Sequence, residues 1–382
     1  MNNLPQPTSE EKIHSEKLQT IIATEIKRKG PISFHDFMQK ALYQPQLGYY
    51  RAGTHKFGSQ GDFVTAPEIS SLFSWCIARQ CAEILSKINH PSILELGAGS
   101  GRMALEILRE LERLNCLPEY YYILEPSADL KQRQLELFAE QGSQFLNKIK
   151  WLSELPPQLF SGVMLANEVI DAIPIHKFKI ENNVFYEFYV DVHNGEFQWQ
   201  SLPAKSPRLI TEIENLNISS PEYASEINLM LKPWIKTLAD SLQEGVVILI
   251  DYGFVRREYY HPERAMGTLM CHYRHRAHDN PLILVGIQDI TAFVDFTRVA
   301  EAALDAHLEI SGFTHQAGFL LNCGIMDFSQ MSSIPEQYAI AQQIKRLILP
   351  SEMGEKFKVI ALSKDYSEPL SGFREFDQLD KL

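Results

Sequence analysis

The feature that most constrains the fold is the segment SILELGAGSGRMALEIL, which begins at Ser92. Its first five residues are apolar enough to form a buried strand, and the pattern from Met103 to Leu114 predicts a helix. Between them lie Gly97, Gly99 and Gly101. Glycine lets the backbone turn sharply and lets a ligand approach the main chain. A strand, a glycine loop and a helix in this order predict an α/β fold that binds a cofactor at the loop.

Strand and helix patterns continue to alternate along the chain. Apolar runs predict further strands at Tyr120 to Leu124, Lys150 to Leu152, Gly162 to Ala166 and Val246 to Tyr252, with a helix at Asp129 to Gln141. Two closing strands are expected at Thr314 to Asn322 and Lys358 to Ser363. This alternation predicts right-handed βαβ units and a mostly parallel sheet.

Other segments surround this core. Helices are predicted from Ser9 to Lys29 and from about Ser70 to Ile88. The stretch from Tyr43 to Ser70 is rich in glycine, proline and aromatic residues, which favours a functional loop over a simple connector. About 80 residues separate the fourth and fifth predicted strands, so an insertion is expected there. It includes a β-hairpin that turns at Asn194 and Gly195.

The glycine spacing and two acidic residues indicate which cofactor the loop takes. The spacing is GxGxG, and Arg102 stands where a dinucleotide fingerprint has its third glycine. Glu95 precedes the first glycine by two residues, where a pyrophosphate would not favour a carboxylate but the amine and sulfonium of S-adenosylmethionine would. Glu125 follows the second strand and can accept both ribose hydroxyls. These features predict S-adenosylmethionine; the alternative is an ordinary glycine-rich turn.

Three polar residues follow the fourth strand, namely Asn167, Glu168 and Asp171. Ligands bind at the carboxyl ends of the strands in an open α/β sheet, so these residues are candidates to position the acceptor of a methyl group. If the turn is helical, Glu168 and Asp171 share one face, and two carboxylates suit a planar guanidinium. The alternative is that Asp171 or Asn167 only caps a helix.

Several longer segments carry a family resemblance. The segments LGYY, GDFVTAPEIS, ELGAGSGR, NEVIDAIP, LIDYG and QDITAFVDF together resemble the MidA-like family of S-adenosylmethionine-dependent methyltransferases. That family includes the mitochondrial enzyme that methylates an arginine of a complex I subunit during assembly. The resemblance implies an α/β fold with a seven-stranded, Rossmann-like class I methyltransferase core, in which Gly97, Gly99 and Gly101 line the cofactor and Glu125 binds its ribose.

The resemblance also bears on the N-terminal part and on the domain organisation. The segment GDFVTAPE, from Gly61, resembles a lid over the cofactor, which implies that Asp62 and Thr65 contact the methionine part or the target side chain. A packed Ω-loop with Asp62 in a turn is the alternative. We expect an N-terminal helix and lid at 1–70, the first part of the core at 71–175, the insertion at 176–245 and the rest of the core at 246–382.

Charge, cysteine content and the N-terminus limit the remaining possibilities. Lys and Arg number 36 against 48 Asp and Glu, giving a net charge of −12, whereas partners such as nucleic acid or an anionic membrane usually require a cationic excess. Five cysteines without a CxxC motif are typical of a reducing compartment. The first residues lack a secretory apolar region. We expect a cytoplasmic protein, or a matrix protein if it is a processed mitochondrial form.

The segment CHYRHRAH, from Cys271 to His278, is the one candidate metal site in the sequence. Zinc ligands at such spacing normally pair with a second cluster, and the interleaved arginines would repel a cation. We therefore expect a basic rim, in which Arg274 or Arg276 pairs with Asp289 or Asp295, and no metal.

Together these features favour a protein arginine methyltransferase that acts on a basic, arginine-bearing segment of a protein acceptor. The first alternative is a methyltransferase fold that works as an assembly or binding factor with little turnover. The second is a small-molecule methyltransferase. A nicotinamide oxidoreductase is disfavoured because Arg102 breaks the dinucleotide spacing.

Overall fold

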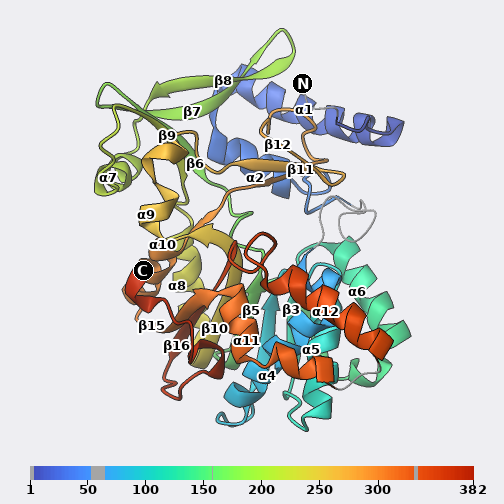
Figure 1. The fold of residues 1–382 in the computed structure, drawn as a ribbon. Coiled ribbons are helices and arrows are strands. Elements are labelled where there is room, and N and C mark those ends of the chain that lie inside the picture. Colours follow the sequence, from blue (N-terminus) through green and yellow to red (C-terminus); the bar gives the residue numbers. More distant parts are fainter. Residues whose placement is uncertain (1–3, 53–64, 157, 331–333) are drawn as a thin grey trace. The chain divides into compact units, whose positions relative to one another are not determined.

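The computed structural model describes residues 4–52, 65–156, 158–330 and 334–382 (Figure 1). The chain divides into two compact units, which are described separately below. Unit 1 comprises Met1–Phe63, Asp171–Leu231 and Arg256–Phe293, and unit 2 comprises Val64–Ile170, Lys232–Val255 and Val294–Leu382. Over the described residues, the helices are too short or too polar to cross a membrane.

Unit 2 contains the predicted α/β sheet. Its strands lie in the order β15-β16-β10-β5-β2-β3-β4, with β14 pairing beside the end of β10 (Figure 1). The five strands from β10 to β4 are parallel, whereas β16 runs antiparallel to both of its neighbours. The bounds are β2 (Ser92–Leu96), β3 (Tyr121–Leu124), β4 (Ile149–Leu152), β5 (Phe160–Asn167), β10 (Leu242–Phe254), β14 (Val294–Asp295), β15 (Glu309–His315) and β16 (Phe357–Lys364).

The helices of unit 2 begin where polar side chains cap them. Ser127 accepts the Leu130 N–H, and Asp295 accepts the Arg298 N–H, each at the first turn of its helix. The helices are α3 (Ala66–Ile69), α4 (Ser71–Leu85), α5 (Arg102–Arg113), α6 (Ala128–Gln141), α8 (Leu231–Ser241), α10 (Phe296–Asp305), α11 (Gln316–Asn322) and α12 (Ile334–Ile348). Short 3₁₀ turns occur at Ser143–Phe145, Ile325–Gln330, Ser371–Phe373 and Leu379–Lys381.

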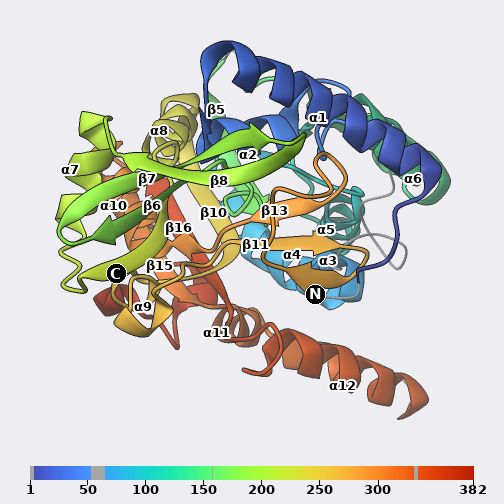
Figure 2. The same cartoon turned by 90° about the horizontal axis from the view of Figure 1, so that it is seen from above.

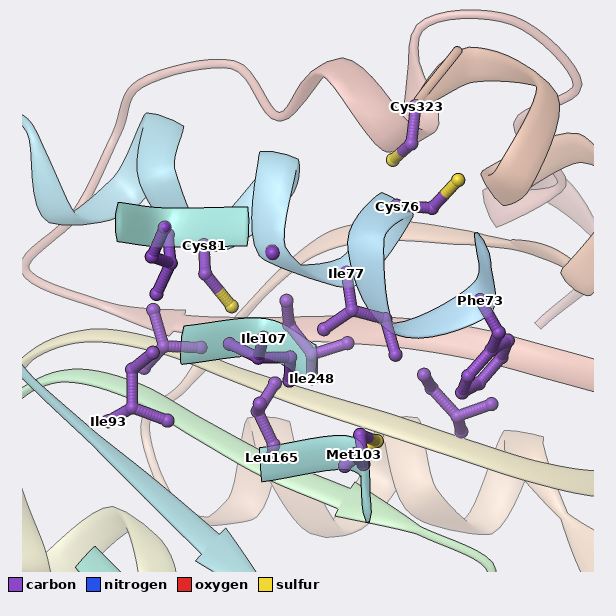
Figure 3. Packing of buried hydrophobic residues seen from close by; sticks show 14 of the residues in the cluster. Phe73, Cys76, Ile77, Cys81, Ile93, Met103, Ile107, Leu165, Ile248 and Cys323 are labelled. Atoms are coloured by element: carbon purple, nitrogen blue, oxygen red, sulfur yellow. The ribbon is translucent and has the colours of Figure 1, made fainter. Parts of the chain in front are cut away.

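One apolar core holds unit 2 together. Ile77 of α4 and Ile107 of α5 face Leu165 of β5 and Ile248 of β10, and all four side chains are fully or almost fully buried (Figure 3). Burying a side chain of this size contributes about 1.5–3 kcal/mol relative to leaving it exposed. The sheet that carries the glycine loop is therefore fixed by packing on α4 and α5.

The prediction for one of the two closing strands, the one at Thr314 to Asn322, is wrong over most of its length. A strand at Thr314 to Asn322 is expected, but β15 ends at His315 and the helix α11 follows at Gln316. The His315 side chain caps that helix by accepting the Gly318 N–H at 3.3 Å. A short apolar run such as AGFLL is compatible with a buried strand or a buried helix, and here the capping residue decides for the helix.

Unit 1 is built on an antiparallel sheet in the order β1-β7-β6-β9, with β8 paired to β7. Figure 2 labels β6, β7 and β8 of this sheet. The bounds are β1 (Ile32–Ser33), β6 (His176–Glu181), β7 (Val184–His193), β8 (Glu196–Pro203) and β9 (Glu222–Ile227). The hairpin predicted at Asn194 and Gly195 is confirmed, because both residues have positive φ and His193 pairs with Glu196.

Helices and a small second sheet complete unit 1. The helices are α1 (Ser9–Lys29), α2 (Phe34–Tyr43), α7 (Pro207–Asn215) and α9 (Arg256–Tyr259), with a 3₁₀ turn at Pro262–Arg264. The second sheet has the order β12-β11-β13, formed by β11 (Met270–Tyr273), β12 (Arg276–His278) and β13 (Asp289–Thr291). The predicted helix at Ser9 to Lys29 is confirmed, and a capping box between Thr8 and Glu11 begins it.

Candidate functional site

The glycine loop connects β2 to α5 as predicted. All three glycines have positive φ, +68° at Gly97, +54° at Gly99 and +84° at Gly101. Residues with a Cβ rarely adopt this conformation, so the loop favours glycine at these positions. The Gly97 N–H donates to the Leu124 carbonyl at 3.2 Å, which extends the pairing of β2 with β3 into the loop. The loop is thereby held at the carboxyl ends of two central strands.

Glu125 follows β3 directly, next to the loop. Its carboxylate is buried and accepts two hydrogen bonds, from the Ser127 N–H at 2.9 Å and from the Gln134 side chain at 3.3 Å. Gln134 also donates to the Gly99 carbonyl at 2.9 Å, so one side chain of α6 contacts both the loop and Glu125. The sequence does not single out Gln134, because periodicity alone does not show what a buried polar residue contacts.

Glu95 lies in the interior of unit 2. It is 1% exposed, and its carboxyl accepts the Tyr121 hydroxyl at 2.7 Å. Burial raises the pKa of Glu95 to about 7, mostly by disfavouring the charged form. The Tyr121 hydrogen bond lowers this pKa by less than burial raises it, and the negative charge of Glu125 adds the smallest effect, a further raise. A carboxyl with this pKa carries only part of a negative charge at neutral pH.

Asn167 and Glu168 end β5, the strand next to β2. The Asn167 side-chain amide donates to the Glu168 carboxylate at 3.2 Å. Glu168 has a φ of +54°, a left-handed conformation that is uncommon outside glycine. Non-glycine residues in this conformation cluster at functional sites, where neighbouring contacts hold them.

The turn after β5 is not helical, which corrects the expectation that Glu168 and Asp171 lie one helical turn apart. No helix forms from Asn167 to Asp171, and neither Asn167 nor Asp171 caps one. The N–H groups that a helix would use are taken up by β10: the Glu168 N–H donates to the Ile250 carbonyl at 2.9 Å, and the Ile170 N–H donates to Asp251 at 2.9 Å. Asp251 is completely buried and therefore fixes the path of this turn.

The turn after β5 and the glycine loop lie side by side in unit 2. A Cβ built on Gly97 would lie 3.1 Å from the Cγ2 atom of Val169. The strands agree with this proximity, because Leu96 of β2 pairs with Ala166 of β5. The structure therefore brings Gly97 and the Asn167–Glu168 turn together, as the sequence predicts for the carboxyl edge of a parallel sheet.

Asp171 belongs to unit 1, where it is buried. There the Tyr50 hydroxyl donates to Asp289 at 2.9 Å, and the Tyr43 hydroxyl donates to the Ala172 carbonyl at 3.0 Å. Burial and the negative charges of Asp289 and Asp171 raise the pKa of both tyrosines. Asp171 is thus part of a buried cluster of carboxylates and phenols.

The expected lid is described only in part. Asp62 lies outside the described residues, whereas Thr65 directly precedes α3. One turn further on, Glu68 of α3 accepts the Ser100 hydroxyl of the glycine loop. The end of the GDFVTAPE segment therefore contacts the loop through Glu68, a residue that the sequence does not single out.

The CHYRHRAH segment forms the hairpin of β11 and β12, which turns at Arg274 and His275, both with positive φ. Arg274 pairs with Glu11 at 2.7 Å. In the described parts of the chain, His, Cys, Asp and Glu side chains form no group of three that could hold a metal.

Comparisons with known proteins show which family the chain belongs to. The profile of a family described as "Putative S-adenosyl-L-methionine-dependent methyltransferase" matches residues 76–314. Among curated relatives, the zebrafish (Danio rerio) protein named protein arginine methyltransferase NDUFAF7, mitochondrial, is 28% identical over 93% of this chain and 92% of its own length. The human protein of the same name is 28% identical over 88% of this chain and 81% of its own length.

A solved structure matches the whole chain. It is that of a Burkholderia thailandensis protein crystallised with S-adenosyl-homocysteine, which is 36% identical and superposes with a TM-score of 0.95 over 100% of both chains. The resemblance to the MidA-like family is thereby confirmed. The chain belongs to this family of S-adenosyl-L-methionine-dependent methyltransferases, and S-adenosyl-L-methionine is its cofactor.

Proposed function

We propose that the protein transfers a methyl group from S-adenosylmethionine to an arginine side chain of a protein acceptor. The observation that carries this proposal is the Asn167–Glu168 turn, which bears a carboxylate at the carboxyl end of β5 and whose next residue, Val169, lies against Gly97 of the glycine loop. The relatives named protein arginine methyltransferase support it from sequence. A basic segment of a respiratory complex I subunit, or of a similar protein, is the acceptor class we propose.

The residues at the loop suit the cofactor. Gly97, Gly99 and Gly101 leave the main chain open to a ligand. Glu125 lies next to the loop and carries a carboxylate, which can accept the ribose hydroxyls. Glu95 would act on the amine and sulfonium through its partial charge. Thr65, and Asp62 outside the described residues, are proposed to contact the methionine part or the target side chain.

The chain's own residues would act mainly by position and charge. When bound, the cofactor supplies an electrophilic methyl group on a positively charged sulfur. A guanidinium nitrogen attacks that methyl carbon as the carbon–sulfur bond breaks, and the nitrogen then gives up one proton. Glu168, held by Asn167, would orient the guanidinium and stabilise its charge, and Asp171 would contribute a second carboxylate. Bidentate contact between carboxylate and guanidinium fixes the orientation.

The first test identifies the acceptor. An extract from a strain that lacks this protein is incubated with the purified chain and methyl-labelled S-adenosylmethionine, and labelled peptides are sequenced by mass spectrometry. The proposal predicts label on arginine side-chain nitrogens of one or a few proteins. Label in small molecules alone would show a small-molecule methyltransferase. Cofactor binding without any label would show a binding factor.

The second test measures the role of Glu168. In Glu168→Gln, single-turnover methyl transfer to the labelled acceptor should fall about 100-fold or more, because one preorganised charge is removed. Affinity for S-adenosylhomocysteine should change by no more than a few-fold. Asp171→Asn should show the same pattern, or a weaker one. Glu140→Gln, an exposed residue of α6, is the matched control and should transfer at the wild-type rate. Full activity in Glu168→Gln would refute its catalytic role.

A further inference from the structure

We infer that Gln134 is a positioning residue for the cofactor, because its side-chain amide joins the glycine loop, Glu125 and Trp151 into one fixed arrangement. Gln134 lies on the inner face of α6 and is 0% exposed. The inference rests on the ribose-binding role proposed for Glu125. In it, the hydrogen bonds of Gln134 hold the Glu125 carboxylate and the glycine loop in the positions that bind the cofactor.

Every polar atom of the Gln134 side chain has a partner. The amide nitrogen donates to the Gly99 carbonyl at 2.9 Å and to the Glu125 carboxylate at 3.3 Å. The amide oxygen accepts the indole N–H of Trp151 at 2.9 Å. A buried amide with both donors and its acceptor satisfied is held in a single position.

Trp151 determines which way the amide points. An indole N–H can only donate, so the end of the Gln134 amide that faces Trp151 must be the oxygen. The nitrogen is then directed toward Gly99 and Glu125, both of which present acceptors. Trp151 lies on β4, so the arrangement extends from the edge strand through α6 to the glycine loop.

The contacts of Gln134 fit a positioning role for Glu125. One oxygen of this carboxylate accepts the Ser127 N–H and the other accepts Gln134, so its plane is fixed from two sides. A carboxylate offers about four lone-pair positions, so one carboxylate can accept hydrogen bonds from several donors at once. A preorganised acceptor binds more tightly because less freedom is lost on binding.

Gln134 also packs against the loop itself. A Cβ built on Gly101 would lie 3.0 Å from the Cγ atom of Gln134, so the side chain takes the space that the glycine leaves. Glycine at 101 and glutamine at 134 are therefore complementary. No other neutral side chain of this length both donates to two acceptors and accepts from an indole.

The test is a calorimetric titration of the full chain with two probes. One probe is S-adenosylhomocysteine, and the other is its analogue without the two ribose hydroxyls. The wild-type protein should prefer the first by about tenfold or more, the scale of one hydrogen bond to a charged group. Gln134→Met removes the amide but keeps the length. The affinity for S-adenosylhomocysteine should then fall more than the affinity for the analogue, and this preference should fall to within about threefold.

Gln132→Met is the matched control, because Gln132 is exposed on the same helix and its side-chain amide donates to Glu136 on that helix. This variant should keep the full preference. A general structural role for Gln134 would weaken both probes equally in Gln134→Met, and that result, like an unchanged preference, would overturn the inference.

Two further variants keep the test decisive if Gln134→Met does not fold. Gln134→Glu retains the acceptor for Trp151 but places a second carboxylate beside Glu125. At low pH the two carboxyl groups can share one proton, and this proton is lost as pH rises. The affinity of this variant for S-adenosylhomocysteine should therefore fall as pH rises. Trp151→Phe removes the indole N–H that holds the Gln134 amide oxygen. It should reduce the preference for S-adenosylhomocysteine over the analogue without abolishing it. A pH-independent, wild-type affinity in Gln134→Glu would contradict the inference.

The result of this titration does not depend on whether the protein methylates arginine, because no acceptor is present in the titration. If the protein methylates some other acceptor, the wild-type preference and its loss in Gln134→Met should still be observed. If the wild-type protein does not distinguish the two probes, Glu125 does not bind the ribose and the positioning role of Gln134 is refuted with it.

Discussion

Glu95 is a completely buried carboxyl whose pKa lies near 7, mainly because burial disfavours its charged form. The sequence predicts a carboxylate at this position before the glycine loop, and the structure places it against Tyr121 within the core. The three glycines and Glu125 are predicted by spacing. The contacts of Glu95, Gln134 and Asp251 are not predicted from the sequence. Packing between segments that are distant in sequence determines which polar side chains meet inside the fold.

The raised pKa of Glu95 predicts how stability varies with pH. Between the usual value near 4.5 and about 7, the native carboxyl keeps its proton whereas the unfolded one has lost it. The native state then binds more protons, so its stability falls as pH rises through this window. Relative to Glu95→Gln, which preserves the acceptor for Tyr121, the wild type should lose about 3 kcal/mol of unfolding free energy between pH 4.5 and 7.

Urea denaturation of both proteins at a series of pH values measures this difference, with Tyr121→Phe as a second variant that removes only the hydrogen bond. Unfolding free energies of wild type and Glu95→Gln that run parallel across the window would show that Glu95 is ionised in the native protein.

At the scale of elements, the ends of β5 and β10 define the turn that carries Glu168. The strands themselves follow from their apolar runs, and most of the parallel sheet is predicted from sequence for that reason. The turn after β5 is not predicted, because its conformation depends on a hydrogen bond from the Ile170 N–H to Asp251 of the neighbouring strand. The same limit applies to α11, where a cap at His315 decides between helix and strand.

Asp251→Asn tests this coupling between elements. An amide at this position can accept from one of the two N–H groups that Asp251 now satisfies, those of Ile170 and Tyr252, but with less charge. We expect a loss of about 1–3 kcal/mol in unfolding free energy, measured by denaturation. Methyl transfer should fall by a larger factor than affinity for S-adenosylhomocysteine, because the turn bearing Glu168 shifts.

The control is Asp240→Asn, an exposed residue of α8, which should match wild type in both respects. Equal loss of cofactor affinity and methyl transfer in Asp251→Asn would contradict the assignment of Asp251 to the turn.

At the scale of the whole molecule, the chain forms two units from interleaved segments. Unit 2 is largely predictable, because βαβ units are local in sequence and right-handed. Unit 1 is less predictable, because it joins three distant segments: Ile32 of β1 pairs with Val190 of β7, and the Tyr50 hydroxyl donates to Asp289. Two-residue strands and long-range antiparallel pairs leave little periodic signal, so within the sheets of unit 1 only the hairpin at Asn194 and Gly195 is predicted.

The most direct test of the account is a crystal structure of the full chain with S-adenosylhomocysteine. The account predicts a carboxylate oxygen of Glu125 within hydrogen-bonding distance of the ribose hydroxyls and the homocysteine part along Gly97 to Gly101. It further predicts that the sulfur faces the Asn167–Glu168 turn. A ligand whose ribose makes no contact with Glu125, or whose sulfur lies away from this turn, would contradict it.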